Sequence, residues 1–211
     1  YNDVATLLKD CVYQPAQIAY SRGEYEAAIA GFTAVSDYSE AADMIRLCNY
    51  DWAAKKAQDG DYDGAIALYE ALGDYKDSAQ KISEVRTMKA QALASTGALD
   101  NLQSAAVIYA DLGDEASLAA TQYQQAALLL ENQKYTEARE IFAALGTYED
   151  AATQLKACDY AIALQKKEAG QLDEAAALLE SISGYSDADE QLKIVRYAQG
   201  EKAVADSLPL A

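Results

Sequence analysis

One motif recurs along this chain at nearly constant intervals, and it limits what the chain can fold into. The copy at residues 60–82, GDYDGAIALYEALGDYKDSAQKI, joins Gly-x-Tyr, a later Ala and an aromatic residue to Leu-Gly-Asp-Tyr. Such a period is typical of repeat proteins, in which each repeat buries its apolar face only by stacking on the next. Counted from the Tyr of Leu-Gly-Asp-Tyr, here called the turn Tyr, repeats begin near Tyr1, Tyr38, Tyr75, Glu115 (in the Tyr position), Tyr148 and Tyr185, with steps of 37, 37, 40, 33 and 37 residues.

The composition favours helix in every repeat. Ala, Leu, Glu and Gln are abundant, and the chain has only two Pro. These residues are strong helix formers, whereas β-branched runs are missing. Each repeat offers a long helix, such as residues 38–58, then a Gly, then a short helix, such as residues 62–72. The sequence therefore predicts an all-α fold built from antiparallel helix pairs, a long helix plus a short helix per repeat.

Local signals predict where the helices begin and end. Residues 37–40, 74–77 and 147–150 each place an acceptor at a helix N-cap and an acid three residues later, the pattern of a capping box. Gly73, Gly113 and Gly146 stand where a short helix ends in a left-handed residue, a conformation that Gly adopts without a Cβ penalty. Acids also open the short helices, where the helix dipole favours negative charge, as at Glu24, Asp61 and Asp173.

Two irregularities interrupt the regular pattern. Pro15 lies inside the first long helix and is expected to kink or divide it near Tyr13. The interval from Gly97 to Tyr109 is three residues longer than the equivalent interval from Gly60 to Tyr69, which predicts a longer loop after Gly97. The interval from Glu115 to Tyr123 is four residues shorter than in the other repeats, which predicts a helix that is shorter by about one turn. No Pro- or Ser-rich linker accompanies them, so the chain is interpreted as a single solenoid domain over residues 1–211.

The tail is expected to form one last helix. Residues 185–206 continue the helical pattern, and Pro209 lies beyond it. No second helix follows, so this helix is interpreted as a terminal cap.

Charge and composition restrict the function. The chain has 34 acidic and 17 basic residues, a formal net charge of -17. Such a surface repels phosphate, so no nucleic-acid partner is expected, anionic lipid is a poor partner candidate, and basic or neutral partners are expected. The chain has no His, the usual general base and the commonest metal ligand. The sequence therefore predicts no enzyme, no catalytic or metal-ligating residues and no cofactor.

The three cysteines stand at one repeat position, ten residues after the turn Tyr: Cys11, Cys48 and Cys158. Equivalent positions on packed helices are about 8–10 Å apart, too far for a disulfide, so all three are interpreted as small buried residues. Free thiols favour a reducing compartment, here the cytoplasm. No stretch approaches the ~18 apolar residues of a membrane span, so this segment is not expected to insert into a membrane.

The sequence opens inside a repeat. Residues 1–11, YNDVATLLKDC, align with residues 38–48, YSEAADMIRLC. We therefore expect these 211 residues to be a fragment of a longer protein. An upstream signal or membrane anchor stays open, and so does the localisation of the whole protein.

The motif resembles a known family. Residues 60–69, residues 23–28 with Phe32, and residues 135–138 with Phe142 are similar to the turn and second helix of tetratricopeptide repeats. This resemblance implies a right-handed α-solenoid whose concave face binds a protein or peptide segment. The chain departs from the family in its period, 37 residues rather than 34, in having Leu-Gly-Asp-Tyr where the family often has Pro, and in lacking the early Trp.

The tyrosines supply a candidate binding site. Of 16 tyrosines, 15 occupy four recurring positions, and one of these lies twelve residues after the turn Tyr. In the resembling family the corresponding first-helix residues face the concave groove, and Tyr is well suited to protein contacts. Packing between repeats is the alternative role. The candidate groove comprises Tyr13, Tyr50, Tyr123 and Tyr160, with Gln17, Ala54, Gln91, Ala127 and Leu164 one turn further along the long helices.

Two functions stay open at this point. The first is a non-enzymatic scaffold that binds a basic or neutral protein or peptide segment. The second is a structural spacer or self-association module that links other domains. The sequence predicts neither the partner nor the oligomeric state.

Overall fold

The structure, a computed structural model, describes the backbone of residues 2–38 and 40–207 and the side chains of residues 10–38 and 40–206. Within these residues the chain forms helices joined by turns. It divides into two compact units, residues 1–95 and 96–211. The single-domain interpretation therefore stays a prediction. Tyr1 and Pro209, which the sequence placed at the ends of the repeat array, lie outside the described residues.

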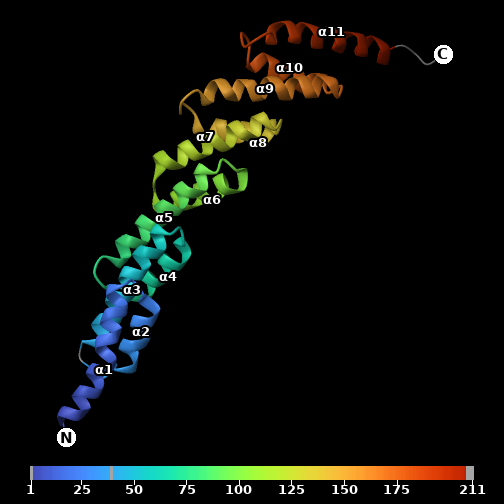
Figure 1. Ribbon diagram of the computed structural model, residues 1–211. Coiled ribbons are helices and arrows are strands. Elements are labelled where there is room, and N and C mark those ends of the chain that lie inside the picture. Colours follow the sequence, from blue (N-terminus) through green and yellow to red (C-terminus); the bar gives the residue numbers. More distant parts are fainter. Residues whose placement is uncertain (1, 39, 208–211) are drawn as a thin grey trace. The chain divides into compact units, whose positions relative to one another are not determined.

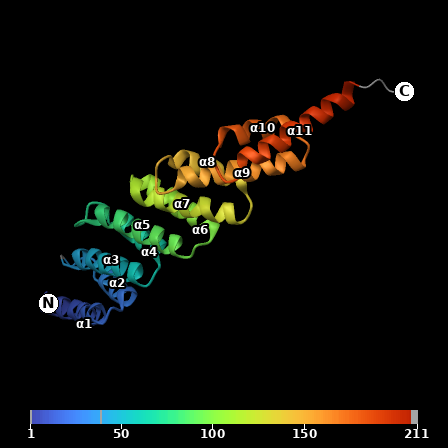
Figure 2. The same ribbon diagram turned by 90° about the horizontal axis from the view of Figure 1, so that it is seen from above.

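In each unit, consecutive helices pack side by side in chain order, as Figures 1 and 2 both show. The all-α prediction is confirmed, and long helices alternate with short ones. Unit 1 contains α1 (Asn2–Ser21), α2 (Tyr25–Ala34), α3 (Ala41–Gln58), α4 (Tyr62–Leu72) and α5 (Ser78–Ser95). Unit 2 contains α6 (Leu99–Leu112), α7 (Glu115–Glu131), α8 (Tyr135–Leu145), α9 (Ala151–Glu168), α10 (Leu172–Ser181) and α11 (Ala188–Ser207).

Small and aromatic residues form the core between paired helices. Each long helix contributes a buried Ala, and each short helix contributes another Ala and a large residue four positions later. In the pair α3 and α4 these are Ala53, Ala65 and Tyr69, which are 0%, 0% and 1% exposed. Small residues let two helices approach closely, and the large residue fills the space beside them. The equivalent sets are Ala16, Ala28 and Phe32; Ala126, Ala138 and Phe142; and Ala163, Ala175 and Leu179.

The predicted capping boxes are wrong, because the long helices begin three residues later than expected. In α5 and α9 the first residues are Ser78 and Ala151, not the turn tyrosines. Lys76 and Glu149 have positive φ, 50° and 45°, and turn the chain before the helix can start. The Tyr148 carbonyl accepts a hydrogen bond from the Ala151 N–H at 3.0 Å, which closes this turn.

The glycines at the ends of the short helices all have positive φ, but only Gly113 adopts the expected left-handed conformation, because ψ is -122° at Gly73 and -104° at Gly146. Gly73, Gly113 and Gly146 have φ of 55°, 69° and 59°. A side chain would strain the backbone there, because L-residues other than Asn and Asp rarely adopt positive φ. These glycines therefore fix the points at which α4, α6 and α8 end.

The region after Gly97 differs from the prediction. The three extra residues lengthen the short helix rather than a loop, since α6 has 14 residues whereas α4 has 11. The following helix α7 has 17 residues, one fewer than α3 and α5, so three of the four missing residues are lost from the turn. Only Gly113 and Asp114 separate the two helices, and the Asp114 carboxylate caps α7 by accepting the Ser117 N–H at 3.1 Å.

Two further predictions concern the N-terminal helix. α1 runs through Pro15 as one helix, so it is not divided there, and the alternative of a kink stays a prediction. Cys11 is exposed, whereas Cys48 and Cys158 are fully buried as expected. Cys48 on α3 belongs to the core formed with α2, and no described helix precedes α1 to cover Cys11 in the same way.

Among the helices of the described residues, none has the length and apolar character that a membrane span requires.

Candidate protein-interaction surface

The four predicted groove tyrosines form hydrogen bonds between helices. Each hydroxyl donates to the carboxylate of an acid that lies 27 residues later and directly precedes the next long helix. Tyr13 donates to Glu40 at 3.3 Å and Tyr50 to Asp77 at 2.5 Å. In unit 2, Tyr123 donates to Asp150 and Tyr160 to Asp187. We refer to these four bonds as the tyrosine–acid links; they join α1 to α3, α3 to α5, α7 to α9 and α9 to α11.

The rings of the same tyrosines pack against other aromatic rings. Tyr50, for example, lies edge-on to Tyr69 of α4 at 5.4 Å between ring centroids and to Tyr75 of the following turn at 6.0 Å. Edge-on pairs of this kind stabilise a packed interface beyond their buried area. The contacts are those expected for packing between repeats. The other pairs are Tyr13 with Phe32 and Tyr38, Tyr123 with Phe142 and Tyr148, and Tyr160 with Tyr185.

The links change the ionisation of both partners. The hydrogen bond to Asp77, followed by burial, raises the pKa of Tyr50 above its usual value. The bond from Tyr50 lowers the pKa of Asp77 in turn. At neutral pH the phenol is therefore a proton donor and the carboxylate an acceptor, which is the combination that a charge-assisted hydrogen bond requires.

One repeat lacks the link. Thr87 on α5 occupies the Tyr position, and its hydroxyl donates instead to the Ser83 carbonyl of its own helix at 3.0 Å. Asp114, 27 residues after Thr87, caps α7. The interval of 27 residues between a Tyr and an acid is visible in the sequence at the four linked positions, and it is the signal that could have predicted the links.

The residues one turn beyond the tyrosines lie at the surface. Gln17, Gln91 and Ala127 are exposed, whereas Ala54 and Leu164 are half-buried. Within each unit they occupy equivalent positions on successive long helices, and none carries a charge. We refer to each set as the neutral strip of its unit: Gln17, Ala54 and Gln91 on α1, α3 and α5, and Ala127 and Leu164 on α7 and α9.

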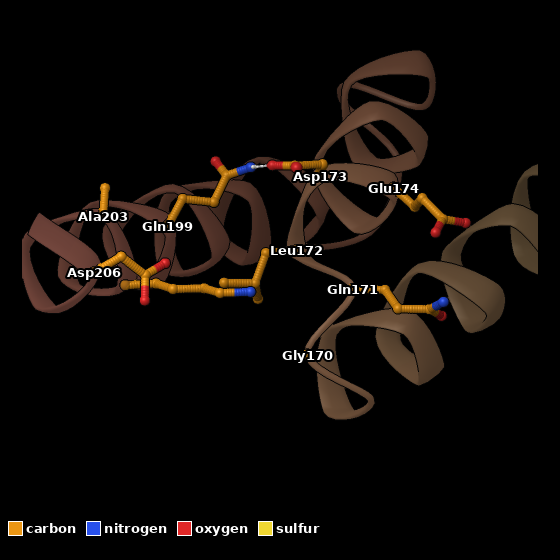
Figure 3. Close-up of a pocket in the computed structure, with 9 residues that line it drawn as sticks. Gly170, Gln171, Leu172, Asp173, Glu174, Gln199, Ala203 and Asp206 are labelled. Atoms are coloured by element: carbon orange, nitrogen blue, oxygen red, sulfur yellow. Dashed lines mark hydrogen bonds between the residues drawn. The ribbon is translucent and has the colours of Figure 1, made fainter.

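A second recurring feature is a shallow depression where a short helix begins. Figure 3 shows the one of unit 2, about 400 Å³, in which the Gln199 amide of α11 donates to Asp173 of α10 at 2.6 Å. In unit 1 the equivalent contact is the ion pair of Lys89 with Asp63 at 2.6 Å. These polar contacts hold the start of a short helix to the next long helix. The depression in Figure 3 is lined by Gly170, Gln171, Leu172, Asp173, Glu174, Gln199, Lys202, Ala203 and Asp206.

The equivalent depression near the start of α2 contains a cation–π contact. The Lys56 ammonium lies 5.1 Å from the centre of the Trp52 ring and also pairs with Asp61 at 2.5 Å. The charged group therefore already has partners within its own unit. The surrounding residues are Gly23, Glu24, Tyr25, Glu26 and Ala27.

Large hydrophobic side chains are exposed only on the end helices of the two units, as far as the described side chains show. Within its own unit an end helix is covered on one side and an inner helix on both, so this distribution follows from stacking. The exposed residues are Val12 and Ile18 on α1, Met88 on α5, Val107 on α6, and Ile194, Tyr197 and Val204 on α11.

Comparison of the sequence with models of known protein families and with curated proteins finds no match.

Proposed function

We propose that this chain is a non-enzymatic scaffold of the tetratricopeptide type, which binds a protein or peptide segment along its long helices. The single observation that carries the proposal is the neutral strip of each unit. Its members are uncharged in a chain with a net charge of -17, and they recur at one register of successive long helices. An uncharged, regularly spaced surface fits an extended or helical segment better than it fits a small molecule.

The tyrosine–acid links support this function indirectly. Because each link joins one long helix to the start of the next, it holds the members of a neutral strip at fixed spacing before any partner arrives. A pre-organised surface loses less conformational entropy on binding, so more of the contact energy appears as affinity. In this proposal the tyrosines position the surface, and the residues one turn beyond them contact the partner.

The partner is expected to be basic or neutral. The acids that accept the links, such as Asp77 and Asp150, lie beside the long helices and add to the overall negative charge. Opposite charge steers association and raises the association rate, and salt screens this effect. Affinity for a basic segment should therefore fall as ionic strength rises.

The proposal is tested by selecting peptides from a displayed random library against the whole chain. Binding of the selected peptide is then compared among Ala127→Arg, Leu164→Arg and the parent chain by fluorescence anisotropy. An Arg side chain in the neutral strip adds bulk and repels a basic peptide, so each variant should weaken binding about tenfold or more.

Matched controls place the same change on short helices. Ala143 of α8 and Ala177 of α10 are exposed alanines, as Ala127 is, and Ala143→Arg and Ala177→Arg should leave binding within about twofold of the parent. Equal losses in strip and control variants, or no peptide selected at all, would contradict the proposal. A binding constant that does not change between low and high salt would contradict the claim that opposite charge attracts the partner.

A structural spacer or self-association module is the second candidate. It is favoured by the exposed hydrophobic residues of the end helices, such as Ile18 on α1 and Ile194 on α11. Apolar faces at the ends of a stack are suited to contacts with another helix layer. Sedimentation velocity over a hundredfold concentration range distinguishes the two: a self-association module forms oligomers that Ile18→Lys or Ile194→Lys disrupts, whereas a scaffold stays monomeric.

A further inference from the structure

One pair of tyrosine rings in unit 1 carries a cation. The Lys76 ammonium lies 4.3 Å from the centre of the Tyr50 ring and 5.4 Å from that of Tyr75. Arg46 approaches the Tyr75 ring as well, at 5.4 Å. Asp77, which accepts the Tyr50 hydroxyl, directly follows Lys76 in the chain. Aromatic faces attract cations, and a neighbouring carboxylate adds to the attraction, so the chain itself fills a cation site here.

Unit 2 repeats the same arrangement around Tyr123. The Tyr123 and Tyr148 rings are 5.9 Å apart between centroids, and the matching pair of unit 1 is 6.0 Å apart. The Tyr123 hydroxyl donates to Asp150, the acid that follows this turn. Residues 76 and 149 both have positive φ, 50° and 45°, so their side chains leave equivalent turns in a similar direction. Residue 149 therefore stands where unit 1 has the lysine that reaches the ring.

The corresponding residues of unit 2 supply no cation. Glu149 replaces the lysine, and Ala119 replaces Arg46, four residues before the tyrosine. Glu149 is exposed, and among the described side chains its carboxylate has no hydrogen-bond or ion-pair partner. The hydrogen bond to Asp150, followed by burial, raises the pKa of Tyr123, and the charge of Glu149 contributes in the same direction. Two carboxylates therefore lie near the Tyr123 hydroxyl, and no described lysine or arginine lies over the ring.

The other ring pair of unit 2 is a poorer cation site. Tyr160 and Tyr185 are 6.1 Å apart between centroids, but the residue between Tyr185 and Asp187 is a Ser rather than an acid. Hydrogen bonds from Gln191 and Tyr160 lower the pKa of Asp187. The charge of Lys167 contributes to this lowering, so the acid already has a cation nearby. The rings around Tyr123 therefore form the stronger candidate.

We propose that the site formed by Tyr123, Tyr148, Glu149 and Asp150 binds the ammonium group of a lysine side chain from a partner segment. The ammonium held in unit 1 shows the mode of binding. The site lies one turn before Ala127 on α7, so a segment whose lysine is bound there continues onto the neutral strip of unit 2. The inference deepens the proposed function and rests on it for the source of the lysine.

The probe is the peptide acetyl-Gly-Ser-Lys-Ser-Gly-amide, whose only charge is its lysine, titrated against the whole chain. Saturation-transfer NMR observes the ε-methylene protons of the lysine, which should receive saturation from the aromatic rings. Binding should saturate with a dissociation constant below about 10 mM, because one cation–π contact and exposed ion pairs are each weak. The same peptide with norleucine in place of lysine should give no signal.

An exchange of charges between the units locates the site. Glu149→Lys places an ammonium beside the Tyr123 ring, as in unit 1, and should weaken binding of the probe at least tenfold. Adding Lys76→Glu empties the site of unit 1, so the double variant should recover binding to within about threefold of the parent, with the parent's net charge. Glu140→Lys is the matched control, because Glu140 is an exposed acid of α8, and it should leave binding within about twofold.

Three results would overturn the proposal. The first is the absence of saturable binding. The second is an equal effect of Glu149→Lys and Glu140→Lys, which is the pattern of long-range charge attraction alone. The third concerns spermidine, titrated in the same way: if Glu149→Lys impairs its binding more than that of the lysine peptide, the site belongs to a free polyamine. The strip variant Leu164→Arg should leave the probe bound within about twofold, so failure of the neutral strip and failure of this site give different results.

Discussion

The hydroxyl of Tyr50 donates a hydrogen bond to the carboxylate of Asp77, 27 residues later, which directly precedes α5. The same separation recurs at Tyr13 and Glu40 in unit 1 and at two places in unit 2. A single hydrogen bond thus connects one long helix to the first residue before the next. Because the acid lies in the turn directly before that helix, the link holds the start of the helix to the preceding long helix.

Two substitutions of Tyr50 should destabilise unit 1 to different extents, because one removes only the hydrogen bond and the other also removes the ring. Tyr50→Phe keeps the ring contacts with Tyr69 and Tyr75 but loses the hydrogen bond, so it should lower the urea midpoint slightly. Tyr50→Ser also removes the half-buried ring and should cost roughly 1–3 kcal/mol of unfolding free energy. Urea titrations followed by circular dichroism measure both.

Tyr197→Ser is the matched control for that experiment, because Tyr197 occupies the same repeat position and is 71% exposed. It should leave the urea midpoint unchanged. A loss of stability equal to that of Tyr50→Ser would show that the repeat position, and not the observed packing, determines the effect.

Alkaline pH should weaken the fold. Hydrogen bonding to Asp187, followed by burial, raises the pKa of Tyr160, and Tyr50 is raised in the same way by Asp77. A tyrosine with a raised folded pKa stays protonated after its unfolded counterpart, with a pKa of about 10, has ionised. Its stabilising contribution is therefore complete below about pH 10 and is lost as the pH rises towards the folded pKa.

The measurement is the unfolding free energy from urea titrations at pH 7, 9.5 and 11. It should be nearly constant between the first two and fall at the third. Tyr160→Phe removes one of the titrating groups and should reduce the fall. A parent chain that is as stable at pH 11 as at pH 7 would contradict the role of the links.

The elements of this fold could be read from the sequence because their causes are local. The short helix of residues 62–72 was predicted with its observed bounds, since Asp61 precedes it and Gly73 ends it. The buried alanines, such as Ala53, follow from the requirement that two paired helices approach closely.

The starts of the long helices could not be read in the same way, because their cause is not local. Asp77 looks like a capping acid in its own segment, yet its carboxylate accepts a bond from Tyr50 of another helix. The positive φ of Lys76 and Glu149 also could not be predicted from the sequence, since neither residue type favours it. The same holds for the tyrosines of the candidate groove: the sequence shows that they share one repeat position, but their contacts depend on three separate segments.

A pair of glycine substitutions tests how closely α1 and α2 approach. A Cβ on Gly31 would lie 2.7 Å from the Cβ of Ala16, and a methyl group on a helix cannot rotate away. Gly31→Ala should therefore destabilise the chain by about 1–2 kcal/mol, although Ala is the better helix former. Gly200→Ala in α11 meets nothing within 4 Å and should stabilise it by roughly 0.5–1 kcal/mol. Thermal unfolding measures both, and a stabilising Gly31→Ala would contradict the observed contact.

The three thiols should differ sharply in reactivity, although the sequence places them at one repeat position. Burial raises the pKa of Cys48 and of Cys158 to about 11, whereas Cys11 is exposed on α1. The thiolate is the reactive form, and a buried thiol reacts only after local opening. At pH 8 an aromatic disulfide reagent should modify one thiol quickly and the other two more than about a hundredfold more slowly.

The control is Cys11→Ser, which should abolish the fast phase of the reaction and leave the slow phase. In urea all remaining thiols should react quickly. Two fast thiols in the folded parent chain would show that α2 or α8 does not cover the long helix that follows it.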